Sequence, residues 1–400
     1  MSYLAKFRPS DVRIAPKLWA MLILMAIPMA VVVFLAYQQQ SGQVAFAENE
    51  RNGVPYASAL NKLIAGGEAH RVGAAGMLNG DSSARSTVET VRADMAKQLE
   101  TLKAVDRKHG KGFEAEARLK QLESDWNAAV AATDAKADFN DIMGKHDAFA
   151  ESALAYIFHI SNASELILDP QIDELNTILA VTISLPRLEV AVGRVTAMSE
   201  YAILGGRTSQ AELSAIAAGI VLAEEHLREA VEYLDTAIAD NPAYAGALKT
   251  KLETTTSETK TLLASVKANV VDAKSVTAAT TRAEDAKVDE ASATLLQSAE
   301  GQLLEALNDR VSSHQRSVYV SLGSAIAGIL VTAAAAYFIA RSITAPISRL
   351  VAAADRISLG DLNVELDIRG KNEVGQLADS LRRMQASLRS AFDRMKRRAA

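Results

Sequence analysis

Three arginines carry the clearest ligand-binding chemistry in this sequence. Arg187 and Arg194 lie seven residues apart, which places them on one face of a helix, and Arg71 follows His70 just before a glycine. Guanidinium groups at helix interfaces bind carboxylates and oxyanions through paired hydrogen bonds. Arg71, Arg187 and Arg194 are therefore the candidate contacts for a small-molecule ligand. The alternative is that they are ordinary arginines on solvated helix faces.

The histidines and several missing motifs indicate that the chain is not an enzyme. The chain has six histidines and no cysteine, and none of the histidines belongs to an H-E-x-x-H pair or a similar close metal-ligand set. The sequence also lacks a G-x-x-x-x-G-K-[ST] phosphate loop and a G-x-S-x-G nucleophile turn. We predict no metal, no cofactor and no catalytic residues. The histidines at 70, 109, 146, 159, 226 and 314 are interpreted as structural or exposed.

Two uncharged apolar runs predict two membrane-spanning helices. The first is residues 18–37 and the second is residues 317–340, which are 20 and 24 residues long. At about 1.5 Å per residue each run can cross a hydrocarbon core of about 30 Å. The first run could instead be a signal peptide cleaved near Ala45-Phe46-Ala47. Its length and the polar Gln38-Gln39-Gln40 before that site favour an uncleaved anchor.

The charge distribution predicts the orientation of these spans. Residues 1–17 carry four basic and one acidic residue, and residues 341–400 carry twelve basic and seven acidic residues, for net charges of +3 and +5. The remaining 27 basic and 40 acidic residues lie in 38–316, for a net charge of −13. Because basic flanks stay in the cytoplasm, we predict an inner-membrane protein with both termini inside and residues 38–316 outside.

The cytoplasmic part carries a heptad pattern in two pieces. The first piece follows Arg341, has Pro346 in its first turn and ends at Gly360. The second begins after a plausible cap at Asn372. The apolar positions are Ile343, Ile347, Leu350, Ala354 and Ile357, and then Val374, Leu377, Leu381, Met384, Leu388, Ala391 and Met395. Two such short helices cannot form a core alone, so we expect a homodimer.

This segment resembles the HAMP module, the linker of chemoreceptors and sensor histidine kinases. The likeness rests on Pro346, on Gly360-Asp361-Leu362 at the start of the connector, and on Glu373-Val374-Gly375 at the start of the second helix. Asn372 stands where the family often has Asp. The resemblance implies a parallel four-helix coiled coil, with Leu362 and Leu366 holding the connector on the bundle. The coupling positions that it assigns are Pro346, Ile347, Leu350, Gly360, Leu362, Leu366, Glu373, Val374, Gly375, Leu377 and Leu381.

The region between the spans is predicted to be entirely helical. Helix breakers divide it at Asn79-Gly80, His109-Gly110, Asp169-Pro170, Gly205-Gly206 and Asn241-Pro242. A single four-helix bundle of this size would need helices of about 105 Å, so two stacked modules fit the spacing better. Residues 164–170 with Asp173 and Leu185-Pro186 also resemble a stretch of large all-helical sensor regions. A simpler interpretation is that Asp169-Pro170 ends one helix and caps the next.

These features predict an all-α receptor that relays an outside stimulus through the second span and the HAMP-like linker to a cytoplasmic output. The predicted order is a tail at 1–17, a span at 18–37, a sensor domain at 38–316, a span at 317–340, a HAMP domain at 341–395 and a basic tail at 396–400. Expected partners are a second copy, a small-molecule ligand, and a cytoplasmic signalling protein or an output domain further along the chain, but no nucleic acid. The alternative is a structural membrane-anchored coiled-coil protein without a sensing role.

Overall fold

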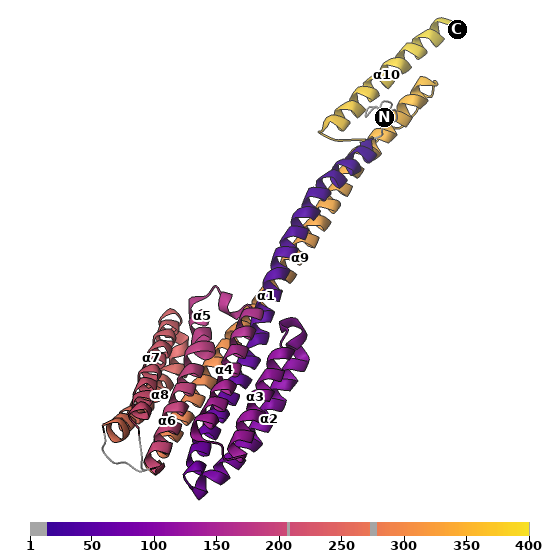
Figure 1. Ribbon diagram of the computed structural model, residues 1–400. Coiled ribbons are helices and arrows are strands. Elements are labelled where there is room, and N and C mark those ends of the chain that lie inside the picture. Colours follow the sequence, from indigo (N-terminus) through magenta and orange to yellow (C-terminus); the bar gives the residue numbers. More distant parts are fainter. Residues whose placement is uncertain (1–13, 206–208, 273–277, 400) are drawn as a thin grey trace. The chain divides into compact units, whose positions relative to one another are not determined.

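The computed structural model describes residues 14–205, 209–272 and 278–399, and every regular element in these ranges is a helix (Figure 1). This confirms the predicted all-α fold. Most of the predicted tail at 1–17, Gly206 of one breaker and Ala400 lie outside the described residues. The chain divides into two compact units. We call residues 42–314 the bundle unit, and residues 1–41 together with 315–400 the terminal unit.

The first four helices of the bundle unit enclose one hydrophobic core. They are α1 (Ile14–Leu78), α2 (Ser82–Phe113), α3 (Glu116–Asp134) and α4 (Phe139–Ala163). Tyr56, Leu63, Met95, Leu122 and Phe149 are among the buried members of this core. Asp81 and Asp138 cap the amino ends of α2 and α4 by accepting hydrogen bonds from backbone N–H groups.

The remaining helices of the bundle unit build a second core beside the first (Figure 1). They are α5 (Ile172–Leu179), α6 (Leu185–Gly205), α7 (Gln210–Asp240), α8 (Ala245–Val266) and the bundle part of α9 (Ala278–Ser358). The apolar series Ile178, Val181, Leu185, Leu188 and Val192, identified from helical spacing, is fully buried here. The period of 3.6 residues thus located the buried face correctly.

Most predicted breakers separate helices, but one does not. Gly80, at φ +83°, ends α1, and Asn241-Pro242 separates α7 from α8. His109-Gly110 was predicted as a break and lies inside α2, which is capped only at Glu114 with φ 51°. The prediction was wrong there because a helix can contain a glycine. The helix ends instead at Glu114, which adopts the left-handed conformation.

A π-helical segment joins α5 to α6. Residues 180–184 form this wider turn directly before the buried Pro186. A proline in a helix has no N–H to donate, and its ring clashes with the carbonyl one turn earlier. The extra residue per turn accommodates this clash, so residues 172–205 continue as one long helix.

The terminal unit contains the amino-terminal part of α1, the carboxyl-terminal part of α9, and α10 (Glu373–Ala399). Helices α1 and α9 both carry a window of high hydropathy that is wholly exposed in the protein, and by length and composition each can cross a membrane. Residues 172–205 also meet the length and hydropathy criteria, but 67% of their apolar window is buried, as in a core helix. In the terminal unit the Gln40 side chain donates a hydrogen bond of 3.1 Å to Ser321 Oγ.

Pro346 does not begin a new helix. It lies inside α9, which continues from Ala278 to Ser358, so the predicted first heptad helix is the last part of α9. A proline costs one backbone hydrogen bond and bends a helix without always ending it. The predicted heptad piece that follows Arg341 therefore continues the helix that contains the second apolar run.

Candidate functional site

The connector between α9 and α10 is held on both helices by a small apolar core. Leu350, Ala353, Ile357, Leu366 and Ala378 are buried in this core. Leu362, Val364, Ile368, Val374 and Leu381 pack around them, half-buried. Leu362 and Leu366, predicted to hold the connector, therefore lie against the helices as expected from their spacing. Pro346 and Ile347 are half-buried, one turn earlier on α9.

Gly360 explains how α9 ends. Its φ is +95°, the left-handed conformation that residues with a Cβ rarely adopt. With this geometry, the N–H of Asp361 donates to the Arg356 carbonyl at 3.0 Å and the N–H of Gly360 donates to Ile357 at 3.1 Å. These two bonds satisfy carbonyls that a helix end otherwise leaves without partners. The glycine is thus a geometric requirement of the turn into the connector.

The start of α10 explains the Glu373-Val374-Gly375 signal. Asn372 accepts a hydrogen bond of 3.0 Å from the N–H of Gly375, so Asn372 caps the helix. Glu373 is exposed in the first turn, where its charge suits the helix dipole. Gly375 is buried, and a Cβ there would overlap the Gly370 carbonyl group. The third position is glycine because the connector backbone passes directly against it.

Two polar residues of α10 hold the connector and were missed from the sequence. The Gln385 amide donates to the Leu362 and Val364 carbonyls at 3.2 and 2.8 Å, and Arg382 donates to Ile368 at 3.3 Å. Gln385 lies seven residues after Ala378, on the face that meets the connector. A polar residue on an otherwise apolar face was the signal that could have identified it.

A second face of α10 is apolar and exposed within one chain. Leu377, Met384, Leu388 and Met395 are 54%, 47%, 39% and 58% exposed. Their spacings of 7, 4 and 7 residues place them on one helix stripe, distinct from the face that packs on the connector. This stripe has the composition of a coiled-coil seam that has no partner within one chain.

The three candidate arginines of the bundle unit occupy different environments. Arg71 is fully buried on α1 and forms ion pairs with Glu68 at 3.2 Å and Asp147 at 3.0 Å. The half-exposed Arg194 lies 3.5 Å from the other oxygen of Asp147, so Arg71 and Arg194 meet at one carboxylate. Arg187 is exposed on α6. The anion-contact role of these arginines stays a prediction, and carboxylates of the protein already engage two of them.

Arg310 of α9 is the centre of a buried ion cluster. Its side chain is 8% exposed and contacts Glu50 of α1 at 2.9 Å, Asp169 at 3.0 Å and Glu174 of α5. Burial and the neighbouring carboxylates raise the pKa of Glu50 to about 8, with a smaller opposing effect from Arg310. Asp169 Oδ1 accepts the Gln171 N–H at 2.8 Å, but α5 begins after Gln171 without a side-chain cap, so the prediction that Asp169-Pro170 caps the next helix was wrong. The Asp169-Pro170 turn is therefore tied to α9 as well as to α5.

Two histidines interpreted as structural form a buried hydrogen-bonded chain. Arg92 Nε donates to His70 Nε2 at 3.0 Å, and His70 Nδ1 lies 2.8 Å from His146 Nε2. His146 Nδ1 lies 2.8 Å from the Ile142 carbonyl. Because Arg92 can only donate, the consistent assignment gives each imidazole one proton and leaves both neutral. Burial lowers the pKa of His70 to about 2 and that of His146 to about 4.

Replacing His146 with Gln should make stability less sensitive to acid. The unfolded chain binds protons at histidine below pH ~6.5, whereas the folded pair does not until far lower pH, so the pair destabilises the fold as pH falls through that range. From pH 7 to 5 we expect the variant to lose about 2 kcal/mol less stability than the parent. Denaturant unfolding at both pH values measures this difference. Equal losses would contradict the assignment, and His70→Gln combined with His146→Gln should enlarge the effect.

Within the described ranges no group of three or more His, Asp or Glu side chains has the geometry to hold a metal ion. The arrangement suits helix packing and electrostatic contacts between helices.

Comparison with known proteins identifies the helix–connector–helix segment. Residues 338–390 match the family model of the HAMP domain, close to the predicted 341–395. The chain therefore contains a HAMP domain, and the resemblance noted from Gly360 and Gly375 is confirmed.

The similar curated proteins are chemotaxis transducers. Methyl-accepting chemotaxis protein TlpB of Bacillus subtilis is 46% identical over 67 residues, which are 17% of this chain and 9% of TlpB. Methyl-accepting chemotaxis protein I of Escherichia coli is 36% identical over 83 residues, 21% of this chain and 15% of the relative. TlpA of Bacillus subtilis is 49% identical over 55 residues, 14% of this chain and 8% of TlpA. The matched part thus spans a small fraction of each relative, and no solved structure matches.

The HAMP domain and these relatives support signal transduction of the chemoreceptor kind. These relatives are named as methyl-accepting chemotaxis proteins, which is a class of signalling protein.

Proposed function

We propose that this chain is a dimeric inner-membrane receptor that relays a stimulus sensed by the bundle unit to its HAMP domain. The observation that carries the proposal is the extent of α9, from Ala278 to Ser358. One helix contains buried bundle residues such as Leu295 and Leu307, an exposed apolar stretch, and the HAMP residues Leu350 and Ile357. A displacement of α9 in the bundle would be transmitted to the coiled coil, whose packing can switch between discrete arrangements.

The orientation is part of the same proposal. Net charges of +3 and +5 flank the two apolar runs and the sequence between them carries −13, which favours an orientation with both termini in the cytoplasm. The HAMP domain then lies inside the cell, where a signalling partner or an output domain can read its packing.

The exposed stripe on α10 should form the dimer seam. The chain has no cysteine, so a single introduced cysteine reports one position without background. We expect Leu388→Cys to give an efficient intersubunit disulfide in membranes, because coiled-coil seam positions of two chains lie close together. Asp379→Cys is the matched control. Asp379 lies nine residues before Leu388, which places it on the opposite face of the helix. Equal cross-linking at both positions would rule out this seam.

The relay itself is tested with a hybrid receptor. Residues 1–395 are joined to the cytoplasmic signalling part of a chemoreceptor, and the cellular response is compared with that of a version whose residues 42–314 are replaced by an unrelated helical bundle. Under the proposal the response to an external stimulus requires residues 42–314. An unchanged response after replacement would favour the alternative of a structural coiled-coil protein.

A further inference from the structure

The bundle unit buries carboxyl groups that lack a basic partner. Glu189 of α6 and Asp285 of α9 are 6% and 7% exposed, and Asp289 lies beside them. Thr196 donates to Asp285 at 2.7 Å, and Glu189 and Asp289 share a hydrogen bond. Among the described residues no lysine or arginine forms an ion pair with these three groups. Burying carboxylates without a cation is costly, so their retention calls for an explanation.

Two of these carboxyl groups line a cavity between α1, α6 and α9. The cavity has a volume of about 220 Å³, and Glu189, Asp289 and Glu300 contribute its acidic groups. Asp289 and Glu300 are eleven residues apart on α9, about 16 Å along the helix. The lining also includes the polar side chains of Ser58 and Gln297 and the apolar side chains of Ala65, Pro186, Ala293 and Leu296. The cavity is therefore long, with acidic groups spread along it and an apolar surface between them.

Asn61 supplies a second, independent sign of a missing ligand. It lines the same cavity and is 5% exposed. Its amide nitrogen donates to the Val181 carbonyl and to Glu300 Oε1, both at 3.0 Å, which fixes the side-chain orientation. Its Oδ1 has no hydrogen-bond partner among the described residues. A buried carbonyl oxygen without a donor costs stability, so this site needs a hydrogen-bond donor from outside the chain.

The charges that line the cavity select the kind of donor. Three acidic groups face one basic group, the exposed Lys62, so the lining charge is −2 when all are ionised. Asp285 also lies next to Glu189 and, when ionised, adds negative charge beside the cavity. An anion would be repelled here, whereas an ammonium group offers three donors and a compensating charge.

We propose that this cavity binds a linear aliphatic polyamine. One ammonium group pairs with Glu189 and Asp289, another donates to Asn61 Oδ1 and Glu300, and the methylene chain lies along Pro186 and Leu296. Burial raises the pKa of Asp289 to about 6 and that of Glu189 well above its usual value. Because the ammonium group favours the ionised carboxylates, binding releases protons.

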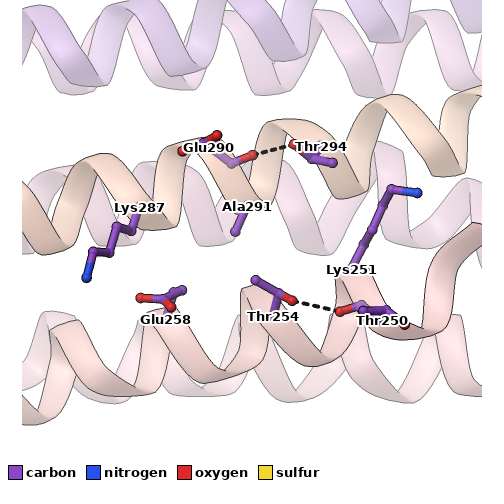
Figure 2. Close-up of a pocket in the computed structure, with 8 residues that line it drawn as sticks. All are labelled: Thr250, Lys251, Thr254, Glu258, Lys287, Glu290, Ala291 and Thr294. Atoms are coloured by element: carbon purple, nitrogen blue, oxygen red, sulfur yellow. Dashed lines mark hydrogen bonds between the residues drawn. The ribbon is translucent and has the colours of Figure 1, made fainter.

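A neighbouring surface groove shows what a charge-balanced lining looks like. It lies between α8 and α9 and has a volume of about 290 Å³. Figure 2 shows two lysines and two glutamates in its wall, Lys251, Glu258, Lys287 and Glu290, with Thr254 and Thr294 bonded to their own helices. Its charged groups are exposed or half-buried and balance one another, so this groove has no unmet need for a ligand.

The test measures binding of spermidine to the full chain in nanodiscs of zwitterionic lipid by calorimetry. We expect saturable binding to the parent, with an enthalpy that changes with the ionisation enthalpy of the buffer because protons are released. Glu189→Gln and Asp289→Asn should each weaken binding at least tenfold. Both should fold at least as stably as the parent, because each replaces a carboxyl group of an acidic cluster with a neutral amide of the same shape. Glu290→Gln is the matched control: it removes one exposed negative charge next to Asp289 in sequence and should bind as the parent does.

Three outcomes would overturn the proposal. The first is that the parent, Glu189→Gln and Asp289→Asn bind spermidine with equal affinity. The second is that Glu290→Gln loses as much affinity as the two cavity variants. The third is that a dicarboxylate such as succinate binds more tightly than spermidine. If a charge variant fails to fold, Ala293→Leu, which fills the cavity without changing charge, should abolish binding in its place.

This ligand class rests on the proposed sensing role, and the two can fail separately. Calorimetry reports binding alone, whereas disulfide formation by Leu388→Cys reports the HAMP domain. Binding without any change in cross-linking would retain the polyamine site and contradict the relay. A hybrid receptor that needs residues 42–314 but binds no spermidine would retain the relay and contradict the site.

Discussion

Replacing Arg310 with Ala should destabilise the bundle unit by about 3–5 kcal/mol, because it removes the cation from a buried cluster. The Arg310 guanidinium contacts the carboxyl groups of Glu50, Asp169 and Glu174, each of which is at most 4% exposed. The substitution leaves these three groups buried without their cation. Truncating one partner of a buried ion pair is costly because the other charge stays buried and unpaired. Thermal unfolding of the full chain, followed by circular dichroism, measures the loss.

The loss should depend on pH in a defined direction. The pKa of Glu50 is raised to about 8 and that of Glu174 to about 7 in the folded protein, mainly by burial. Removing Arg310 raises both further. A carboxyl group with a raised folded pKa destabilises the fold as pH rises from its unfolded value of ~4.5 through the folded value. Arg310→Ala should therefore cost more at pH 8 than at pH 5.

Arg228→Ala is the matched control for Arg310→Ala. Arg228 also contacts more than one carboxylate, Glu225 and Glu232, but on the exposed surface of α7. Solvent screens such pairs, so the control should leave the unfolding temperature unchanged. A similar loss in both variants, or a loss in Arg310→Ala that is independent of pH, would show that burial of the Arg310 cluster is not the cause.

The sequence predicted those parts of this protein that depend on periodicity and on backbone geometry. Heptad spacing located Leu350, Ile357 and Leu381 on packed helix faces, and Gly360, where the heptad pattern stops, ends α9 in the left-handed conformation. The apolar runs were also evident because a membrane-length helix without charges is rare in soluble proteins. Each of these signals lies within one local stretch of sequence.

The polar interior could not be predicted in this way. Arg310 contacts Glu50, which lies 260 residues away in the sequence, and His70 contacts His146, which lies 76 residues away. Nothing in the local sequence links either pair. Arg71 was considered as a ligand contact because guanidinium groups at helix interfaces bind carboxylates and oxyanions. The structure pairs it with Glu68 and Asp147, so its role depends on residues brought together by folding.

Gly375→Ala should disrupt the HAMP connector, although Gly→Ala in a helix normally stabilises by about 0.5–1 kcal/mol. Gly375 lies in the first turn of α10, and an added Cβ would overlap the carbonyl group of Gly370 and lie 2.8 Å from the Gly370 Cα. The obstacle is backbone, which cannot rotate away as a flexible side chain can, so the connector must move. Overpacking of this kind costs about 1–3 kcal/mol, which reverses the usual sign.

The change should be visible as faster hydrogen exchange in the connector and the first turns of α10. A cost of about 3 kcal/mol corresponds to a roughly hundredfold loss of protection, because every 1.4 kcal/mol is tenfold. Gly301→Ala is the control, since Gly301 lies exposed in α9 with no atom within 4 Å of an added Cβ, and exchange there should stay the same or slow. If Gly375→Ala left protection of the connector unchanged, close approach of the backbone could not be the reason for glycine at this position. The same substitution should also lower cross-linking of Leu388→Cys. The seam on α10 lies next to the face that contains Ala378 and Gln385, and the connector, by holding that face, orients the seam toward the second chain.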